Sequence, residues 1–176
     1  MGENMHEHRE KIIIAHARQA IKDIALPSEK NISELTKHSR SIIRKWQASC
    51  AEDPKIGNAI ELTIWHPQSR AFGFSVYDAV SKTAYELKVT CKNPRNQFYK
   101  AICKALLKNS PDKEQKEPED NEEKDNIVDK LILIVSPEGE KNLYGTENGQ
   151  PGNSLPSQMI DRVKFGFDVK IVKIDQ

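Results

Sequence analysis

The spacing of hydrophobic residues changes along the chain, and each spacing predicts a different element. Over 5–25, and again from 31 or 33 to 50, apolar residues recur every three or four positions, as in an amphipathic helix. Over 59–65, apolar and polar residues alternate, which predicts a half-buried strand. Two further β-rich runs flank 81–83 and predict a hairpin.

The second half of the chain alternates between helix and strand patterns. The expected elements are a helix from 93 or 96 to 107, a strand over 129–135, a short helix from 154 or 157 to 164, and a strand over 167–174. The strand at 129–135 is almost continuously apolar, which is typical of a sheet covered on both faces. Residues 109–126 are poor in apolar residues and dense in charge, so we expect a disordered loop there.

The order of these elements predicts the fold class. It is helix, helix, three strands, helix, strand, helix, strand. Three consecutive strands joined by short turns form an antiparallel meander, and the two later strands join the same sheet. We therefore expect an α/β fold with a mixed sheet covered by helices. A length of 176 residues fits a single domain spanning 1–176, with N-terminal helices at 5–50 and a core at 59–176.

Composition is that of a polar, soluble, globular chain, with 37% hydrophobic and 30% charged residues. No apolar run approaches the ~18 residues that a membrane span needs, so we expect no membrane association. The N-terminus does not have the pattern of a signal peptide. The cysteines Cys50, Cys91 and Cys103 lack zinc-site spacing and are an odd number. Reduced thiols in a cytoplasmic protein are the interpretation that this favours.

The net charge of +1 conceals an asymmetry along the chain. Residues 109–126 contain eight acids and three lysines, a net charge of −5. The rest of the chain therefore has a net charge of +6. A mildly basic body with an acidic segment is compatible with binding to nucleic acid.

The predicted hairpin contains a charged pattern that is unusual for a strand. Glu86 and Lys88 are two residues apart, so the pleat places both side chains on one face. Asp78 lies on the partner strand, and the length of the turn decides its face. A two-residue turn points Asp78 away from Glu86, whereas a three- or five-residue turn or a bulge brings them to one face. The alternative interpretation is a solvated strand face with a weak ion pair.

This arrangement resembles the PD-(D/E)XK nuclease superfamily, in which an Asp on one strand of a hairpin is followed by Glu-x-Lys on the next. The matching residues are Asp78, Glu86 and Lys88, with Tyr77 in the place of the proline. The resemblance extends over about 59–135 in element order. It implies a restriction-endonuclease-like fold.

The resemblance also implies a chemistry. Asp78, Glu86 and the carbonyl group of Leu87 would bind Mg²⁺ beside the scissile phosphate, since hard oxygen ligands suit this ion. Lys88 would orient or deprotonate the attacking water and offset negative charge in the transition state. We expect Asp78 and Glu86 to approach closely enough to share one cation.

Four other residues are accessory candidates. Glu61 on the first strand and Glu34 on the second helix are each a candidate third carboxylate, although each also fits an ordinary surface position. Gln97 and Lys100 lie on one side of the helix after the hairpin, with Lys104 one turn further on. Gln97 and Lys100 are candidates to face the site or the phosphates, and a structural role fits them equally well.

The second helix has an alternative interpretation. Residues 32–46 resemble a helix-turn-helix, with Arg40, Arg44 and Lys45 on the reading helix. The apolar stripe runs through this segment without a break, which favours one packed helix. The three cations would then form a solvated or phosphate-contacting face.

We therefore predict a small metal-dependent endonuclease that hydrolyses DNA phosphodiester bonds, in the manner of a restriction enzyme. We expect a homodimer, because two copies can cut both strands. The first alternative is a non-catalytic member of the same fold that binds nucleic acid or a protein. The second is a helix-turn-helix DNA binder.

Overall fold

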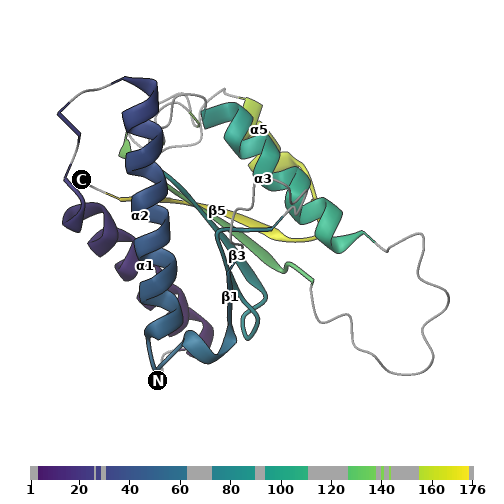
Figure 1. Cartoon of the computed structure of the whole chain (residues 1–176). Helices are drawn as coiled ribbons and strands as arrows, with labels where there is room; N and C mark the ends of the chain where they lie inside the picture. Colours follow the sequence, from purple (N-terminus) through teal and green to yellow (C-terminus); the bar gives the residue numbers. More distant parts are fainter. Residues whose placement is uncertain are drawn as a thin grey trace.

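The computed structural model describes residues 4–25, 27–28, 31–62, 73–89, 94–110, 127–137, 140, 143 and 155–174. Within these residues, one five-stranded mixed sheet lies between two layers of helices (Figure 1). The predicted α/β class, with its sheet covered by helices, is confirmed.

The sheet has the strand order β1-β2-β3-β4-β5, so neighbours in sequence are neighbours in space. The strands are β1 (Ile60–Leu62), β2 (Val76–Asp78), β3 (Thr83–Lys88), β4 (Lys130–Val135) and β5 (Asp168–Lys173). β2 is antiparallel to both β1 and β3, as the predicted meander requires. β4 is parallel to β3, and β5 is parallel to β4. The predicted continuation of the first strand to 65 lies outside the described residues.

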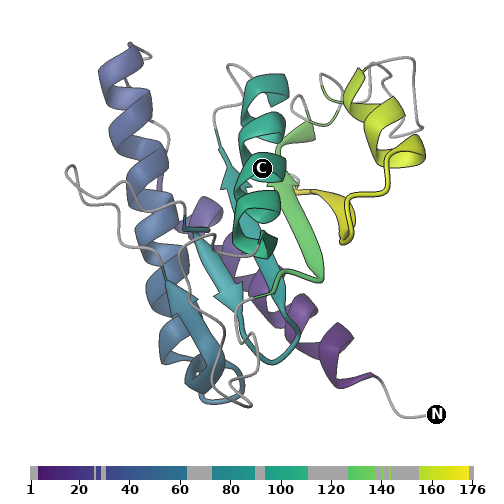
Figure 2. The same ribbon diagram turned by 90° about the vertical axis from the view of Figure 1, so that its right-hand side faces the viewer.

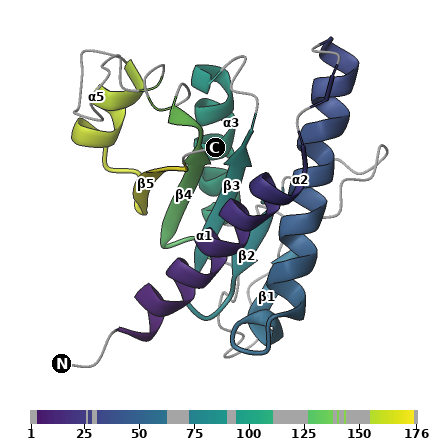
Figure 3. The same ribbon diagram turned by 90° about the vertical axis from the view of Figure 1, so that its left-hand side faces the viewer.

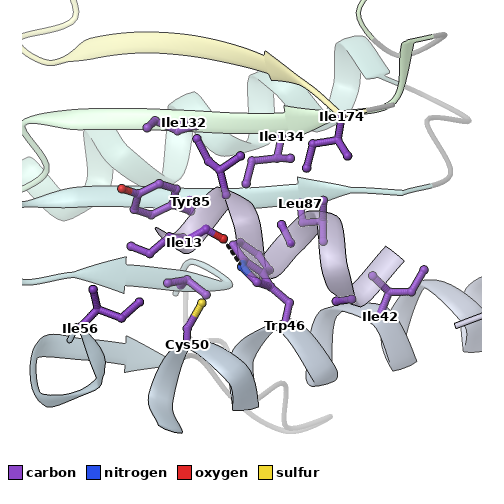
Figure 4. Close-up of a cluster of buried hydrophobic side chains, with 14 residues drawn as sticks. Ile13, Ile42, Trp46, Cys50, Ile56, Tyr85, Leu87, Ile132, Ile134 and Ile174 are labelled. Atoms are coloured by element: carbon purple, nitrogen blue, oxygen red, sulfur yellow. Dashed lines mark hydrogen bonds between the residues drawn. The ribbon is translucent and has the colours of Figure 1, made fainter. Parts of the chain in front are cut away.

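One face of the sheet is covered by α1 (Met5–Asp23) and α2 (Ile32–Glu52) (Figure 3). Their apolar stripes pack on the odd-numbered side chains of β3 and the even-numbered side chains of β4. Figure 4 shows Trp46 of α2 at the centre of this layer, where its indole Nε1 donates a 3.0 Å hydrogen bond to the carbonyl oxygen of Ile13. The buried indole thus satisfies its one donor while its ring fills the core.

The other face is covered by α3 (Pro94–Asn109) and α5 (Leu155–Arg162) (Figure 2). Phe98, Ile102 and Ala105 of α3 are buried against Leu131 and Leu133 of β4. Because both faces of β4 are covered, its run of apolar residues needs no polar alternation.

The second helix decides between the two interpretations of 32–46. Asn31 caps α2 by accepting a 2.9 Å hydrogen bond from the backbone NH of Glu34, and the helix then continues without a break to Glu52. The single packed helix that the apolar stripe favoured is therefore confirmed, and the alternative helix-turn-helix interpretation is wrong, because no turn separates two helices in this segment.

Some helix boundaries differ from the predicted ones. α3 continues to Asn109, two residues beyond the predicted end, and Asn96 lies inside this helix and is not its cap. α5 ends at Arg162, before the predicted Lys164. The loop predicted for 109–126 therefore begins after the helix end, and its residues 111–126 lie outside the described residues.

Candidate functional site

Glu86 and Lys88 of β3 share one face of the sheet, as the pleat predicted, and α3 covers that face. Ala84 on the same face belongs to the α3-side core, whereas Tyr85 and Leu87 belong to the α1- and α2-side core. Glu86 pairs with Leu133 of β4 in the register of the sheet, and only 3% of Glu86 is exposed. A carboxylate is thus held near the centre of a covered sheet.

Two lysines bind this carboxylate. The Nζ atom of Lys88 lies 2.7 Å from Oε2 of Glu86, and the Nζ atom of Lys104 lies 2.7 Å from Oε1. Lys104 also donates a 3.1 Å hydrogen bond to the carbonyl oxygen of Gly73, and the hydroxyl of Ser75 lies 3.4 Å from Oε2. We call Glu86, Lys88 and Lys104 the lysine–glutamate cluster.

The charges of this cluster are strongly coupled. Burial opposes the ionised form of Glu86, but the neighbouring ammonium groups of Lys88 and Lys104 outweigh it and lower the pKa of Glu86 below its ordinary value. Glu86 is therefore a carboxylate at neutral pH, and the cluster has a net charge of +1. The lysine side chains are 21% and 28% exposed against 4% for Glu86, so the charge nearest to solvent is positive.

Lys104 is the member that the sequence analysis did not select as a candidate. It stands in the middle of α3, between the buried Ala101 and Ala105, and its Nζ atom lies 5.9 Å from the ring centre of Phe74. The available signal was its position one turn beyond Lys100, on the side of the helix next to the buried stripe. Ser75 was also missed, because a hydroxyl at the start of a short strand has no distinctive pattern.

Asp78 lies on the opposite face of the sheet, so the expected pair of carboxylates is wrong. Asp78 pairs with Thr83, and Tyr77 pairs with Ala84, which places Asp78 with Tyr85 and away from Glu86. The turn at 79–82 contains an even number of residues. Like the two-residue turn considered above, it therefore points Asp78 away from Glu86. One cation cannot contact Asp78 and Glu86 through a sheet.

The contacts of Asp78 explain its burial. Arg9 of α1 donates two hydrogen bonds to it, from Nε to Oδ2 at 2.8 Å and from Nη2 to Oδ1 at 2.6 Å. The hydroxyl of Ser81 donates a third, at 2.7 Å. Arg9 also donates to the carbonyl oxygens of Lys55 and Ile56. Asp78 is thus a structural residue that fixes α1 to the hairpin.

The proposed metal ligands do not assemble into one site. The carbonyl group of Leu87, the third expected ligand, belongs to β3, and its expected partners Asp78 and Glu86 lie on opposite faces of the sheet. Among the described residues, no group of three or more His, Cys, Asp and Glu side chains is placed to hold a metal ion.

The accessory candidates lie in different places. Glu61 pairs with Tyr77 and so shares the face of Glu86, but it is exposed on β1, with β2 between them. Glu34 lies in the other helical layer, where it forms a 2.7 Å ion pair with Lys37. Gln97 and Lys100 are both on α3; Lys100 is exposed, and Oε1 of Gln97 is buried without a hydrogen-bond partner in the described part of the chain.

The three predicted nucleic-acid contacts are all on α2. Arg40 and Arg44 are exposed, whereas Lys45 forms a 2.7 Å ion pair with Asp23 of α1. α2 belongs to the layer on the other side of the sheet from the lysine–glutamate cluster. The structure therefore does not bring these residues to the cluster.

A separate surface cavity of about 780 Å³ lies where α5 leads into β5, next to the start of β4. Its lining mixes both signs of charge: Asp129, Asp161 and Asp168 alternate with Lys130, Arg162, Lys164 and Lys170. None of the cluster residues lines it. With three acids among four cations, this lining has no region of a single charge sign.

No protein-family model matches the chain, and searches of curated proteins and of solved structures found no match. None of the described helices combines the length and the hydrophobicity that spanning a bilayer requires.

Proposed function

We propose that this protein binds nucleic acid through the phosphate backbone, at the lysine–glutamate cluster. The observation that supports this most is one buried carboxylate held between two ammonium groups on the same sheet face. An ammonium group has three donors, and within the described residues Lys104 uses two of them, on Glu86 and on the carbonyl oxygen of Gly73, so a third can reach a phosphate oxygen.

The role of Glu86 in this proposal is to position the two lysines. Free lysine side chains lose rotamer entropy when they bind a ligand, and an ion pair that already orders them reduces this loss. The net charge of +6 outside 109–126 adds a longer-range attraction for polyanions.

We further propose that the domain has a restriction-endonuclease-like architecture. What supports this is the element order, in which two helices precede a strand meander and a helix then separates each later pair of strands. If this relationship holds, the site has changed. The acid of the first hairpin strand binds Arg9, and the hydroxyl of Ser75, just before that strand, lies beside Glu86.

Metal-dependent cleavage of DNA is the second candidate function. It is favoured by Glu86 and Lys88, which share a face as the Glu-x-Lys motif requires. A two-carboxylate site does not fit the described residues, but Mg²⁺ can bind through one carboxylate when substrate phosphates supply further oxygens. Cutting both strands would additionally require two copies of the chain.

A binding assay with four variants tests the first proposal. Fluorescence anisotropy with labelled DNA in EDTA should show binding that weakens in Lys88→Gln and in Lys104→Gln. Glu86→Gln should bind more tightly, because its amide oxygen can still order one of the two lysines while the negative charge that competes with a phosphate is removed. Lys45→Gln is the matched control, since that lysine is paired with Asp23 in the other layer. Absence of binding at low salt would overturn the proposal.

The variant Glu86→Gln also separates the two functions. If the protein is a nuclease, plasmid cleavage in Mg²⁺ should fall by roughly 10²–10³ in this variant, because it loses the charge that the reaction needs. Metal-dependent cleavage would be excluded if Glu86→Gln bound DNA more tightly and the wild type cut no plasmid in Mg²⁺.

A further inference from the structure

α3 is a helix with cations and no acids. Its sequence from Pro94 to Asn109 contains one arginine and three lysines, and neither Asp nor Glu. The lysines, Lys100, Lys104 and Lys108, follow each other at intervals of four residues. Residues four apart lie on the same side of a helix, about 6 Å apart along its axis. We call these three residues the lysine row.

The lysine row runs along the side of α3 that borders β2 and the segment before it. Lys104 reaches the carbonyl oxygen of Gly73 and lies over the ring of Phe74. One turn further on, Nζ of Lys108 lies 4.2 Å from the ring centre of Tyr77. Contacts with aromatic faces hold an ammonium group in place and leave its charge intact.

The aromatic rings beneath the row are not available for stacking. Phe74 and Tyr77 are each 2% exposed, so they support the lysines from below and present no face to a base. Among the described residues, Glu86 is the one carboxylate that forms an ion pair with the row. The row is therefore a line of positive charge on an apolar support, and its buried rings present no aromatic face to a base.

We propose that the lysine row binds one strand of a nucleic acid along its phosphates and directs it across the lysine–glutamate cluster. This inference rests on the proposed function and extends it, because it assigns a line of phosphate contacts to one strand and predicts binding without sequence preference. A line of cations on one helix matches one backbone, and electrostatic contacts to phosphates carry no sequence information.

The salt dependence of binding measures the number of phosphates contacted. For a single strand, the logarithm of the association constant falls against the logarithm of salt concentration with a slope of about −0.7 for each phosphate neutralised. The three lysines of the row together with Lys88 should therefore give a slope of roughly −3.

The test uses short single-stranded DNA oligonucleotides of unrelated sequences with the full chain. Lys100→Gln and Lys108→Gln should each reduce the magnitude of the slope by about 0.7. Lys100→Arg and Lys108→Arg should keep the wild-type slope, because the charge is retained. Lys22→Gln is the control, since Lys22 is exposed on α1 in the opposite layer. Thermal melts should show that every variant is folded.

The outcomes distinguish this inference from the proposed function. If Lys104→Gln weakens binding but Lys100→Gln and Lys108→Gln leave the slope unchanged, the cluster binds phosphate and the row is refuted. If the wild type binds no DNA, both fail. Affinities that differ strongly between oligonucleotides of equal length would also overturn the inference, because a line of phosphate contacts has no means of discriminating bases.

Discussion

At the scale of single residues, Glu86 determines the charge of the proposed site. It is buried, and its two oxygens are bound by different lysines from different elements. Removing its proton is favourable in the folded protein because both ammonium groups are already present. The ionisation of Glu86 is therefore linked to folding.

This linkage gives a prediction about acid stability. The pKa of Glu86 is lowered in the folded state, despite its burial, by Lys88 and Lys104, from a value of about 4.3 in an unfolded chain. A lowered pKa contributes stability that is complete above the unfolded value and is lost as the pH falls through the folded value. The difference in the free energy of unfolding between wild type and Glu86→Gln should thus be largest at neutral pH and shrink below about pH 4.

Urea unfolding curves at several pH values check this prediction. Glu34→Gln is the control, because its carboxylate is in an exposed helical pair with Lys37 and should contribute little. Part of the acid dependence should persist in Glu86→Gln, since Lys130 and Lys170 likewise lower the pKa of Glu10, against the effect of burial. A difference between wild type and variant that stays constant with pH would contradict the assigned coupling.

At the scale of elements, the contact between α1 and the hairpin is the feature that the sequence pattern did not indicate. The side chains of Arg9 and Asp78 are 8% and 0% exposed and form a bidentate pair. The hydrogen bonds to Asp78 raise the pKa of Arg9, against the effect of burial. The guanidinium also binds two carbonyl oxygens before η1 (Gly57–Ala59).

Removing one partner of this pair should be costly. Asp78→Ala leaves the guanidinium of Arg9 buried without its anion, and such a loss typically costs about 3–5 kcal/mol of stability. The combination of Asp78→Leu with Arg9→Met should recover part of this loss, because it removes both charges. Thermal and urea unfolding measure the effect.

The same variants test whether Asp78 has a catalytic role. Asp23→Ala is the control, since Asp23 is in a surface pair with Lys45 and its loss should have only a small effect. If Asp78→Ala kept wild-type stability and lost a metal-dependent activity, the structural role assigned to Asp78 would be wrong.

At the scale of the whole molecule, charge is divided between the folded body and the segment after α3. The side chain of Asn109 closes the two ends of this segment: its Nδ2 donates to the carbonyl oxygen of Val128 at 2.8 Å, and its Oδ1 accepts from the NH of Val128 at 2.7 Å. The two ends of 111–126 are therefore held together by residues outside that segment.

Replacing 111–126 by a short Gly-Ser linker should therefore leave the melting temperature nearly unchanged. A segment so rich in charge cannot bury enough apolar surface to offset its ordering. The same replacement removes a net charge of −5 and should tighten binding to DNA at low salt. Asn109→Ala is the contrasting variant and should lower the melting temperature, because it leaves the backbone groups of Val128 unpaired. A large fall in the melting temperature of the linker variant would contradict this division.

The sequence alone determined the elements and their order, because helix and strand periodicity is a local property. It also determined that Glu86 and Lys88 share a face, since two residues of one strand always do. The almost continuous apolar run of β4 likewise indicated a strand covered on both sides before its neighbours were known.

The tertiary structure alone decided which charged groups meet. The face of Asp78 depended on the even length of the turn at 79–82, and a change of one residue would have reversed it. Lys104 is 18 residues from Glu86 along the chain, and Arg9 is 69 residues from Asp78. Each pair meets because α3 and α1 pack on opposite faces of the sheet. Periodicity assigns a side chain to a face of its own element, but the partner across the interface is set by register and packing.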